Sequence, residues 1–444
     1  MTRRWQGPLQ LEDGTKILQS VDSESPALHE RLSALHEHWL RVERGVNAWE
    51  RSRYRRAMGP PEHRDYHPSF ANSLVEAVSI PPFVAQLDPA FIFGQEVFTY
   101  GLATALCTAG PKVLMPWGGD VFRFSETSSV AFTMVRRALH GVDLVVPGAV
   151  VGAQRVVDRF GVPAEKVYVN SWGIDRTLFR RASEEERRAF CIRHRIDPAS
   201  LIILNIRRFK PRWGCDLVTE AFSRLALEDA TLQFFALGGE GSESFVAEAR
   251  KRILAKGLAR RITILDGHIP DASVRQLVSV ADIFTSLVRL NDMGSDSVKE
   301  GAAAGATPVV SDIASNREME RLGFRALFTE KLDASAVVAA VQRAIHDPAL
   351  RAEVAAANQR YLEKYEDNDY NMLRLLDLIA SCPVRTEESA RAGISYTLAV
   401  IDEIIGGRKH LGLLSNLVRL RRGCSHPLNS ARSAWRELRM FLHF

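Results

Sequence analysis

Two acids stand eight positions apart in the stretch NDMGSDSVKEGAAAGATPVVSD, residues 291–312. Asp292 lies in a glycine-containing loop, and Glu300 lies within a helix that we expect to begin near Ser295–Ser297. The free N–H groups and the dipole at such a helix start favour an anion. A carboxylate one turn further along can accept hydrogen bonds from ribose or sugar hydroxyls. The small residues that follow it, 302–305, would let the helix lie close to a sheet.

Cations and glycines follow the neighbouring predicted strands. RRFKPRWG (207–214) places four cations after one strand, LGGEGSES (237–244) places three glycines after the next, and DGHIPD (266–271) follows a third. In open α/β sheets, ligands bind in the crevice beyond the carboxyl ends of the strands. Glycines there let the backbone approach a ligand closely. Because cations facing a helix N-terminus suit a diphosphate, these loops predict a site for a nucleotide diphosphate that carries a sugar.

From about residue 88 the chain alternates between short apolar strands and helical segments, which is typical of parallel sheets with helical crossovers. The alternation predicts an α/β fold with two Rossmann-like, doubly wound domains that face each other across a cleft, followed by a helical C-terminal extension. Strands are expected within PAFIFGQ, KVLMPWGGD, VDLVVPGA, EKVYVNSWGID, SLIILNIRRF, LQFFALGGEGSE, RITILDG, DIFTSLV and TPVVSD.

Four regions follow from this pattern. We expect a Rossmann-like N-terminal domain over 1–180, irregular in its first 87 residues, and a Rossmann-like domain with the predicted nucleotide-sugar site over 181–365. The charged segment RRASEEERRAF suits the boundary between them. Helices over 366–404 are expected to pack back on the N-terminal domain, and 405–444 forms a basic amphipathic tail.

Bulk properties exclude several classes of protein. Hydrophobic residues make up 46% of the chain and charged residues 25%, which is ordinary for a globular protein. We find no apolar run of the roughly 18 residues that a membrane helix needs, and no secretory signal pattern at the start. The five cysteines are scattered and lack CxxC spacing, which favours neither a disulfide framework nor a zinc site and fits a reducing cytoplasm.

The positive charge is concentrated in the tail. Residues 405–444 hold eight Lys or Arg side chains and one acid, so the tail carries +7 while the whole chain carries +5. HLGLLSNLVRLRRG and SARSAWRELRMFLHF interleave Leu, Trp and Phe with Arg. Such helices bind anionic membrane surfaces, although packing on a protein partner or on the chain itself is an alternative. Since no nucleic-acid motif accompanies the tail, we expect no nucleic-acid partner.

The acid pair followed by GAAAGATPVVSD resembles the donor-site motif of retaining GT-B glycosyltransferases of the group 1, or family 4, type. This group includes glycogen synthases and bacterial mannosyl- and glucosyltransferases. The order of NIRRFKPRWGCDLVTEAF, ALGGEGSES, RITILDGHIP and the acid-pair stretch matches the C-terminal domain of that group, and VYVNSWGIDRTLF resembles its interdomain passage. The resemblance is specific over 201–312, weaker over 88–179, and does not extend to the tail.

The resemblance implies roles for individual residues of the donor domain. Glu300 would bind the ribose, Asp292 would contact the hydroxyls of the donor sugar, and Arg208 would contact the diphosphate. Gly294 and Ser295 would form the start of the anion-binding helix. Further donor-site residues are the cleft-lining Gly239 and Gly241, His268 near the base, and the candidate diphosphate cations Lys210 and Arg212.

Three positions depart from the family pattern. Asp292 stands where the family usually has Glu, and Trp117 often has His in its place. Trp213 stands where the family usually has Lys, so a diphosphate cation is lost unless Lys210 or Arg212 substitutes for it.

Each candidate residue also has a purely structural alternative. Glu300 could be a solvated helix acid, and Asp292 could cap its loop. Arg207 and Arg208 could both be exposed loop charges, whereas a phosphate contact by one of them favours Arg208. Asp120, in PWGGD, would face the cleft as a catalytic group, or it would only cap the helix that follows. EDND (366–369) resembles a DxD metal motif, but it lies in a predicted helix, which favours a solvated face and no metal.

The implied activity is the transfer of a hexose or similar sugar from a UDP- or GDP-linked donor to a hydroxyl acceptor, with retention and without a metal or other cofactor. The expected acceptor is a glycolipid or polysaccharide precursor, and the expected location is the cytoplasm, peripheral on the inner face of the membrane. One alternative is a non-catalytic GT-B subunit that acts as a binding partner in a glycosylation complex. A nucleotide-sugar epimerase of the same fold would explain the donor site but not the basic tail.

Overall fold

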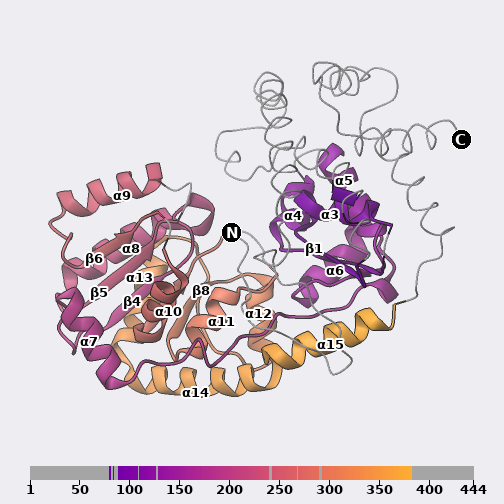
Figure 1. Cartoon of the computed structure of the whole chain (residues 1–444). Helices are drawn as coiled ribbons and strands as arrows, with labels where there is room; N and C mark the ends of the chain where they lie inside the picture. The colour runs from indigo at the N-terminus through magenta and orange to yellow at the C-terminus, as the bar shows by residue number, and fades with distance from the viewer. Residues whose placement is uncertain are drawn as a thin grey trace, which may run out of the picture.

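The computed structural model describes residues 80–81, 84, 89–108, 110–126, 129–239, 243–267, 269–289 and 293–382. The tail at 405–444, the first 79 residues and three predicted site residues lie outside these ranges. Two α/β units lie side by side, and the long helix α14 runs beneath the C-terminal unit toward α15 below the N-terminal one (Figure 1). Among the described helices, none is both long and apolar enough to cross a membrane.

The N-terminal unit is built on a small parallel sheet. In its described part the strand order is β1-β2-β3, with β2 in the centre. The helices that follow these strands bury Phe98, Leu102 and Val135 against it. The elements are β1 (Ile92–Gln95), α3 (Val97–Leu106), β2 (Lys112–Met115), α4 (Gly119–Phe122), η2 (Phe124–Glu126), α5 (Ser129–His140), β3 (Leu144–Val145), α6 (Val150–Phe160) and η3 (Ala164–Lys166).

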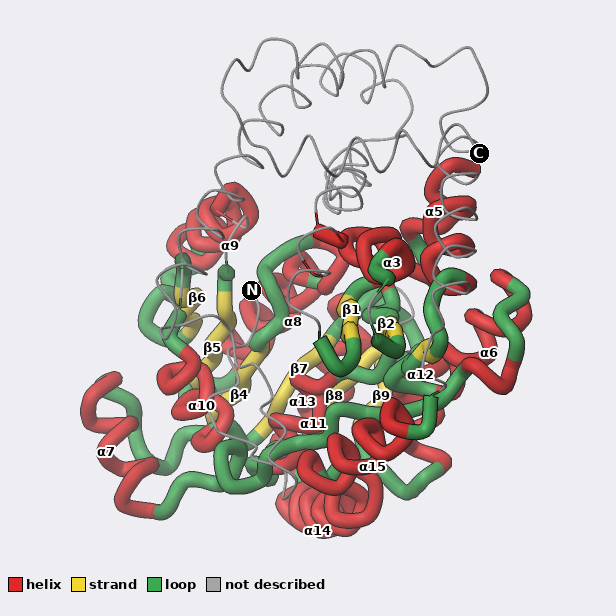
Figure 2. The backbone as a smooth tube through the Cα atoms, turned by 45° about the vertical axis from the view of Figure 1, so that its right-hand side comes forward, coloured by secondary structure: helices red, strands yellow, loops and turns green. Residues whose placement is uncertain are grey.

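The C-terminal unit is a six-stranded parallel sheet with helices on both faces (Figure 2). Its strands run in the order β6-β5-β4-β7-β8-β9, which is the doubly wound order of dinucleotide-binding folds. Apolar clusters fill both faces. The strands are β4 (Ile202–Asn205), β5 (Gln233–Leu237), β6 (Ile262–Leu265), β7 (Ile283–Ser286), β8 (Thr307–Ser311) and β9 (Leu327–Thr329). The helices are α7 (Glu184–His194), η4 (Pro211–Trp213), α8 (Cys215–Glu228), α9 (Glu243–Ala255), α10 (Asp271–Val280), α11 (Asp296–Ala303), α12 (Ala314–Arg321), α13 (Ala334–His346) and α14 (Pro348–Tyr365).

The predicted α/β fold with two Rossmann-like units is confirmed, with local corrections. The strand expected in EKVYVNSWGID is wrong, because this segment forms only isolated bridges, Val145 with Val167 and Ile174 with Asp367. The charged segment expected at a boundary is the helix α7, whose start carries a capping box between Ser183 and Glu186. Strand β9 was not predicted.

The chain passes between the two units twice, and the two crossing segments contact each other. In the outgoing segment, the N–H of Ile174 donates to the carbonyl of Glu366, in the returning segment, at 2.7 Å. The amide of Asn368 donates to the carbonyl of Trp172 at 2.7 Å. Gly173 has φ +73, and a Cβ there would lie 2.6 Å from the Cα of Asn368, so only glycine lets the two segments come this close.

Helix α15 (Asn368–Ala380) returns the chain to the N-terminal unit. Its Leu375 and Ile379 are buried in one cluster with Val113, Leu144 and Val146 of the small sheet. The last described helix therefore belongs by packing to the N-terminal unit, although it follows the C-terminal unit in sequence.

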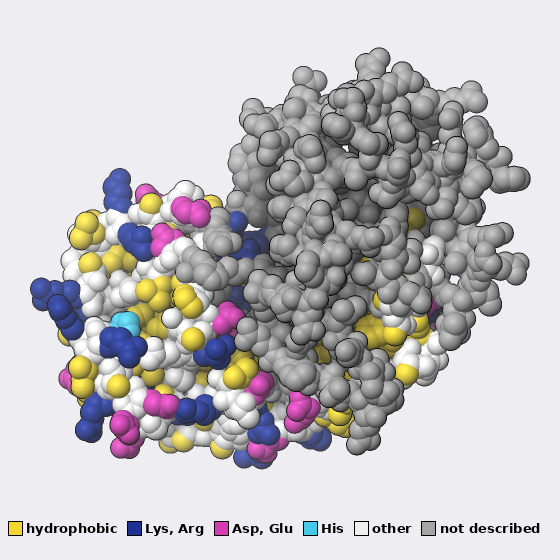
Figure 3. All heavy atoms as spheres, viewed as in Figure 1, with side chains coloured by type: hydrophobic (Ala, Val, Ile, Leu, Met, Phe, Trp, Pro, Cys, Tyr) yellow, Lys and Arg dark blue, Asp and Glu magenta, His cyan; other side chains and the backbone are white. Residues whose placement is uncertain are grey.

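Basic and acidic side chains are intermixed over the visible described surface of the C-terminal unit (Figure 3). This agrees with the charge count, because the chain without its tail carries a net −2. Surface charge therefore does not mark a site on this face, and the site has to be located from the topology of the sheet.

Candidate functional site

The topology of the C-terminal sheet identifies one edge as the candidate site. Strands β4 and β7 are neighbours at its centre, and the chain continues from them to opposite sides, to β5 and to β8. Ligands of doubly wound sheets bind beyond the carboxyl ends of such a strand pair. The cationic loop follows β4, and the acid-pair stretch follows β7, so the sheet brings these two predicted loops together.

Arg207 lies at this edge and contacts both loops. Its Nε donates to the Ser286 hydroxyl at the end of β7 at 3.1 Å, and its Nη2 donates to the Ser295 hydroxyl at 2.5 Å. Ser295 is the N-cap residue of α11 and also lies 2.9 Å from the Ser297 hydroxyl. A guanidinium therefore lies beside a helix N-terminus, where both favour an anion. The sequence analysis favoured Arg208 for this place.

Arg208 is exposed and lies over Gly239. A Cβ at Gly239 would approach Arg208 Cγ to 3.3 Å, and the backbone there has φ +74, which favours glycine. The next residue, Phe209, donates its N–H to the carbonyl of Gly238 at 2.9 Å and joins the two loops. The predicted pair of Arg208 and Gly239 thus lies on the same edge as Arg207.

The same loop holds the two other candidate cations. Lys210 is half-buried and precedes the short helix η4. The Arg212 guanidinium carbon lies 3.8 Å from the centroid of the Trp213 ring, which is a cation–π contact. Trp213, where the resemblance implies lysine, therefore orients a neighbouring cation.

Glu300 is fully buried in the second turn of α11, with 0% exposure. The alternative of a solvated helix acid is therefore wrong. The helix lies close to β7, since a Cβ at Gly301 would come within 2.7 Å of the Phe284 ring. From α14, the Gln359 amide donates to the carbonyl of Ala303 at 2.9 Å and fixes the other end of α11.

Three predicted site residues, Asp292, Gly241 and His268, lie outside the described residues. Of the predicted start of the anion-binding helix, Gly294 has φ +91, which favours glycine, and it directly precedes the N-cap residue Ser295.

Asp120 is buried in the N-terminal unit, with 1% exposure, and organises its loop. Its carboxylate accepts backbone N–H groups from Val97 at 2.8 Å, Trp117 at 3.1 Å, Gly118 at 2.8 Å and Val121 at 3.0 Å. Burial raises the pKa of this carboxyl, although the four donors favour its charged form. These contacts favour a structural role for Asp120, and its catalytic role in the cleft stays a prediction. Trp117, in contrast, is 46% exposed.

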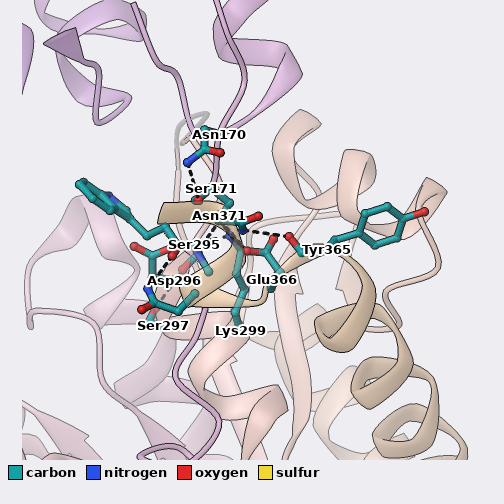
Figure 4. Close-up of polar contacts among 12 residues, drawn as sticks. Asn170, Ser171, Ser295, Asp296, Ser297, Lys299, Tyr365, Glu366 and Asn371 are labelled. Atoms are coloured by element: carbon teal, nitrogen blue, oxygen red, sulfur yellow. Dashed lines mark hydrogen bonds and ion pairs between the residues drawn. The ribbon is translucent and has the colours of Figure 1, made fainter. Parts of the chain in front are cut away.

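A second polar cluster includes Lys299 of α11 and joins both crossings (Figure 4). Lys299 Nζ lies 2.9 Å from the Glu366 carboxylate and donates to the Ser171 hydroxyl at 2.6 Å. Glu366 also accepts from the Ser171 hydroxyl at 2.5 Å and from the Tyr361 hydroxyl at 3.0 Å. Asp296 lies 3.7 Å from the same ammonium. This cluster, which we call the hinge cluster, connects the first turn of α11 to the linker and to the end of α14.

The hinge cluster keeps its lysine charged. Burial alone would lower the pKa of the Lys299 ammonium, but the carboxylates of Glu366 and Asp296 outweigh it and raise the pKa above the usual 10.5. Both partners are desolvated, with 2% exposure for Lys299 and 3% for Glu366.

The EDND segment is corrected in two respects. It does not lie within one helix, because α14 ends at Tyr365 and α15 begins at Asn368. Glu366 is not on a solvated face, since Lys299 binds it in the interior. Among the described residues, no group of three or more His, Cys, Asp or Glu side chains could hold a metal ion.

A pocket of about 180 Å³, lined by both polar and apolar residues, lies beside the hinge cluster and between the two units. It is lined from the N-terminal unit by Gly148, Asn170 and Ser171, and from the C-terminal unit by Gly294, Lys299 and Ser315, among others. The Ser315 hydroxyl is buried and makes no hydrogen bond with the described residues. Since a buried hydroxyl requires a partner, water is the simplest occupant of this pocket.

The hinge cluster was not predicted from the sequence, and neither was the contact of Arg207 with Ser295. One signal pointed to Lys299, which interrupts the small and apolar residues of a helix packed on a sheet. Its partner Glu366 could not be identified by pattern, because it lies 67 positions further along the chain.

Solved structures show the class of fold. HepE of Anabaena, solved with UDP and glucose, is 16% identical, with a TM-score of 0.58 over 68% of this chain and 82% of its own. Sucrose-phosphate synthase of Thermosynechococcus elongatus is 17% identical, with a TM-score of 0.58 over 70% and 79%. The UDP-forming α,α-trehalose-phosphate synthase of Burkholderia xenovorans is 15% identical, with a TM-score of 0.60 over 77% and 86%. The chain has the GT-B fold.

Residues 187–361 match the family described as glycosyl transferases group 1. The matched segment includes the whole six-stranded sheet and the loops of the candidate site. No curated protein sequence matches the chain.

We expect that removing only the cation of the hinge cluster destabilises the protein more than removing both charges. Lys299→Met leaves the Glu366 carboxylate buried without its cation, and should lower the free energy of unfolding by about 3–5 kcal/mol. Adding Glu366→Gln removes the buried charge, keeps acceptors for Tyr361 and Ser171, and should restore most of the loss. The measurement is the urea midpoint of each variant.

As a control, Arg176→Ala breaks the exposed Arg176–Glu363 pair between the linker and α14, and should cost at most about 1 kcal/mol. A wild-type midpoint for Lys299→Met would show that the hinge cluster does not stabilise the fold. Since the pKa of Lys299 is raised, its contribution is present at neutral pH and is lost only as the pH rises through the folded-state pKa.

Proposed function

We propose that this chain is a glycosyltransferase that moves a sugar from a nucleotide diphosphate donor to a hydroxyl acceptor. One observation carries the proposal. The loop after β4 places Arg207 against the N-terminus of α11, and the buried acid Glu300 lies in the next turn of that helix. A diphosphate at this edge of the sheet would meet a cation and free N–H groups, as a developing anion requires.

The residues then take the following roles. Arg207 and Arg208 bind the diphosphate, with the stacked Arg212 and Lys210 nearby on the same loop. Gly239 and Gly294 keep the backbone close to the donor, and Glu300 accepts ribose hydroxyls. Asp292 contacts the donor sugar. We propose that transfer proceeds with retention, so that the acceptor enters on the face from which the diphosphate leaves, and that no metal takes part.

We propose UDP as the nucleotide of the donor. HepE was solved with UDP and UDP-glucose, and the trehalose-phosphate synthase is described as UDP-forming, which favours UDP over GDP. A hexose is the proposed sugar. The proposed acceptor is a glycolipid or polysaccharide precursor, which suits a chain with a basic amphipathic tail.

A non-catalytic GT-B subunit is the rival function. The replacement of the expected lysine by Trp213 favours it, but the Arg212 guanidinium on the Trp213 ring keeps a cation at that place. Binding of UDP without turnover of any UDP-sugar would favour the rival. Interconversion of the donor without an acceptor would instead favour an epimerase.

The first prediction concerns the two acids. Glu300→Gln should weaken UDP binding and lower kcat/KM by roughly 10- to 100-fold each, because a hydrogen bond to a charged acceptor contributes about 1.5–3 kcal/mol in ground and transition states alike. Asp292→Ala should preserve the affinity for free UDP and reduce turnover. Calorimetry with UDP and initial rates with UDP-sugars measure both quantities.

The matched control is Glu363→Gln, which changes an exposed acid of α14 far from the site and should behave as wild type. If Glu300→Gln and Asp292→Ala both bind UDP and turn over like the control, the acid pair is not the donor site and the proposed function is wrong.

The second prediction concerns metals. Turnover of the purified protein should survive EDTA, because the cations and the helix N-terminus neutralise the leaving diphosphate. The measurement is the initial rate before and after dialysis against EDTA, with Mg²⁺ or Mn²⁺ added back. Complete loss in EDTA with recovery on metal addition would overturn the metal-free mechanism.

The third prediction concerns the tail, 405–444. We propose that it holds the protein on an anionic membrane surface, since it carries +7 and each basic residue near such a surface contributes about 1 kcal/mol. The full chain should sediment with phosphatidylglycerol vesicles and less with phosphatidylcholine vesicles, whereas a chain ending at Glu403 should stay in solution. Equal sedimentation of both chains at physiological salt would favour a tail that packs on protein.

A further inference from the structure

The chain leaves β7 directly beside the cationic loop that follows β4. Gly214, which ends η4, lies so close to this exit that a Cβ there would come within 2.8 Å of the carbonyl oxygen of Leu287. Its φ of +67 also favours glycine, and Leu287 is fully buried. The turn formed by η4 therefore packs on the backbone that follows β7.

Arg289, two positions further along, binds the same turn through its backbone and its side chain. Its backbone N–H donates to the carbonyl of Arg212 at 3.1 Å, and its Nε donates to the carbonyl of Pro211 at 2.9 Å. Its Nη2 donates to the carboxylate of Asp216, in the first turn of α8, at 2.5 Å. One guanidinium therefore contacts both the start of η4 and the helix that follows it.

This contact is the counterpart of the one that Arg207 makes. Arg207 belongs to the cationic loop and donates to Ser295, the N-cap residue of α11. Arg289 belongs to the stretch after β7 and donates to the cationic loop. The two segments are therefore joined in both directions, and the turn that Arg289 binds carries Lys210 and Arg212, the two further cations of the proposed diphosphate site.

Stability alone does not account for the Arg289 contact. The Arg289 side chain is 39% exposed and that of Asp216 is 49% exposed, and exposed ion pairs contribute little to the free energy of unfolding. A single 3₁₀ turn such as η4 has few hydrogen bonds of its own and poor hydrogen-bond geometry. Contacts from outside the turn therefore decide which conformation it holds.

We propose that Arg289 is a positioning residue for the diphosphate site, and that Asp216 orients it. The inference rests on the proposed function. Arg289 itself does not touch the donor. By holding the carbonyls on either side of the peptide that joins Pro211 to Arg212, it fixes the turn from which the Arg212 side chain reaches the phosphates. Its loss should therefore weaken the binding of a ligand that carries phosphates and spare the binding of a nucleoside.

The experiment uses the full chain and measures the Kd of UDP and the Kd of uridine by calorimetry. Arg289→Gln removes the guanidinium and keeps the backbone N–H. It should raise the Kd of UDP on the order of 10-fold, because the loss of one hydrogen bond to a charged group corresponds to about that factor. The Kd of uridine should stay unchanged. Arg289→Lys keeps the charge but lacks the planar fork of donors, and should give an intermediate Kd for UDP.

Asp216→Ala separates positioning from a simple attraction of charges. If Arg289 acted on the diphosphate only through its charge, removal of the neighbouring carboxylate would tighten the binding of UDP. A positioning role predicts the opposite, a raised Kd of UDP, because the guanidinium loses the charged acceptor that orients it. The matched control is Arg252→Gln, which breaks the exposed Arg252–Glu248 pair of α9 in the same unit and should leave both Kd values unchanged.

Hydrogen exchange tests the turn itself without any ligand. The N–H groups of Trp213 and Gly214 make the hydrogen bonds that close η4. Both should exchange faster in Arg289→Gln, whereas Arg252→Gln should leave their exchange unchanged.

Three results would overturn the positioning role and leave the proposed function standing. These are wild-type UDP affinity in Arg289→Gln and Asp216→Ala, an equal loss of UDP and uridine binding in Arg289→Gln, and tighter UDP binding in Asp216→Ala. If the unmutated chain neither binds UDP nor turns over any UDP-sugar, the proposed function fails, and the positioning role fails with it.

Discussion

The arrangement of the molecule depends on one buried ion pair, that between Lys299 and Glu366. Two desolvated charges are costly unless they meet each other and satisfy their remaining hydrogen bonds, and here Ser171 and Tyr361 complete the set. Ser171 belongs to the outgoing linker, Lys299 to α11, and Glu366 to the end of α14. Since separating these segments would leave a buried charge without its partner, the ion pair fixes α11 relative to both crossings.

The sequence patterns predicted the features that depend on neighbouring residues, namely most of the strands and the close packing of α11 on its sheet. Strand β4 lies within an apolar run that is buried along its whole length, and the glycines and alanines after Glu300 let α11 pack closely on the sheet. Parallel strands put their carboxyl ends on one edge, so the convergence of the cationic loop and the acid-pair stretch also followed from sequence. The direction in which an individual side chain points could not be predicted from the sequence. Arg207 and Arg208 are neighbours of the same type, and only the exit of the chain from β4 decides which of them meets Ser295.

The features that sequence missed are contacts between distant segments. By its local sequence alone, Lys299 could be an exposed helix residue, because its partner Glu366 comes much later in the chain. Glu366 belongs to an acidic run that is typical of a solvated surface. The break between α14 and α15 places it in the interior. Met293 lies in a loop, and its sequence neighbours do not indicate that it is buried. The glycines that it approaches, Gly148 and Gly152, belong to the N-terminal unit. The contact between Asp120 and Val97 is of the same kind, because it forms only when α3 packs beside the loop after β2.

The double crossing also limits how the two units can move. A single linker would permit rotation in any direction, but here the outgoing and returning segments are bonded side by side through Ile174 and Glu366. Twisting one unit against the other would shear that bond and separate Gly173 from Asn368, whereas bending about the bonded pair keeps both contacts. The paired crossings therefore oppose a twist of one unit against the other more than they oppose a bend about Ile174 and Glu366.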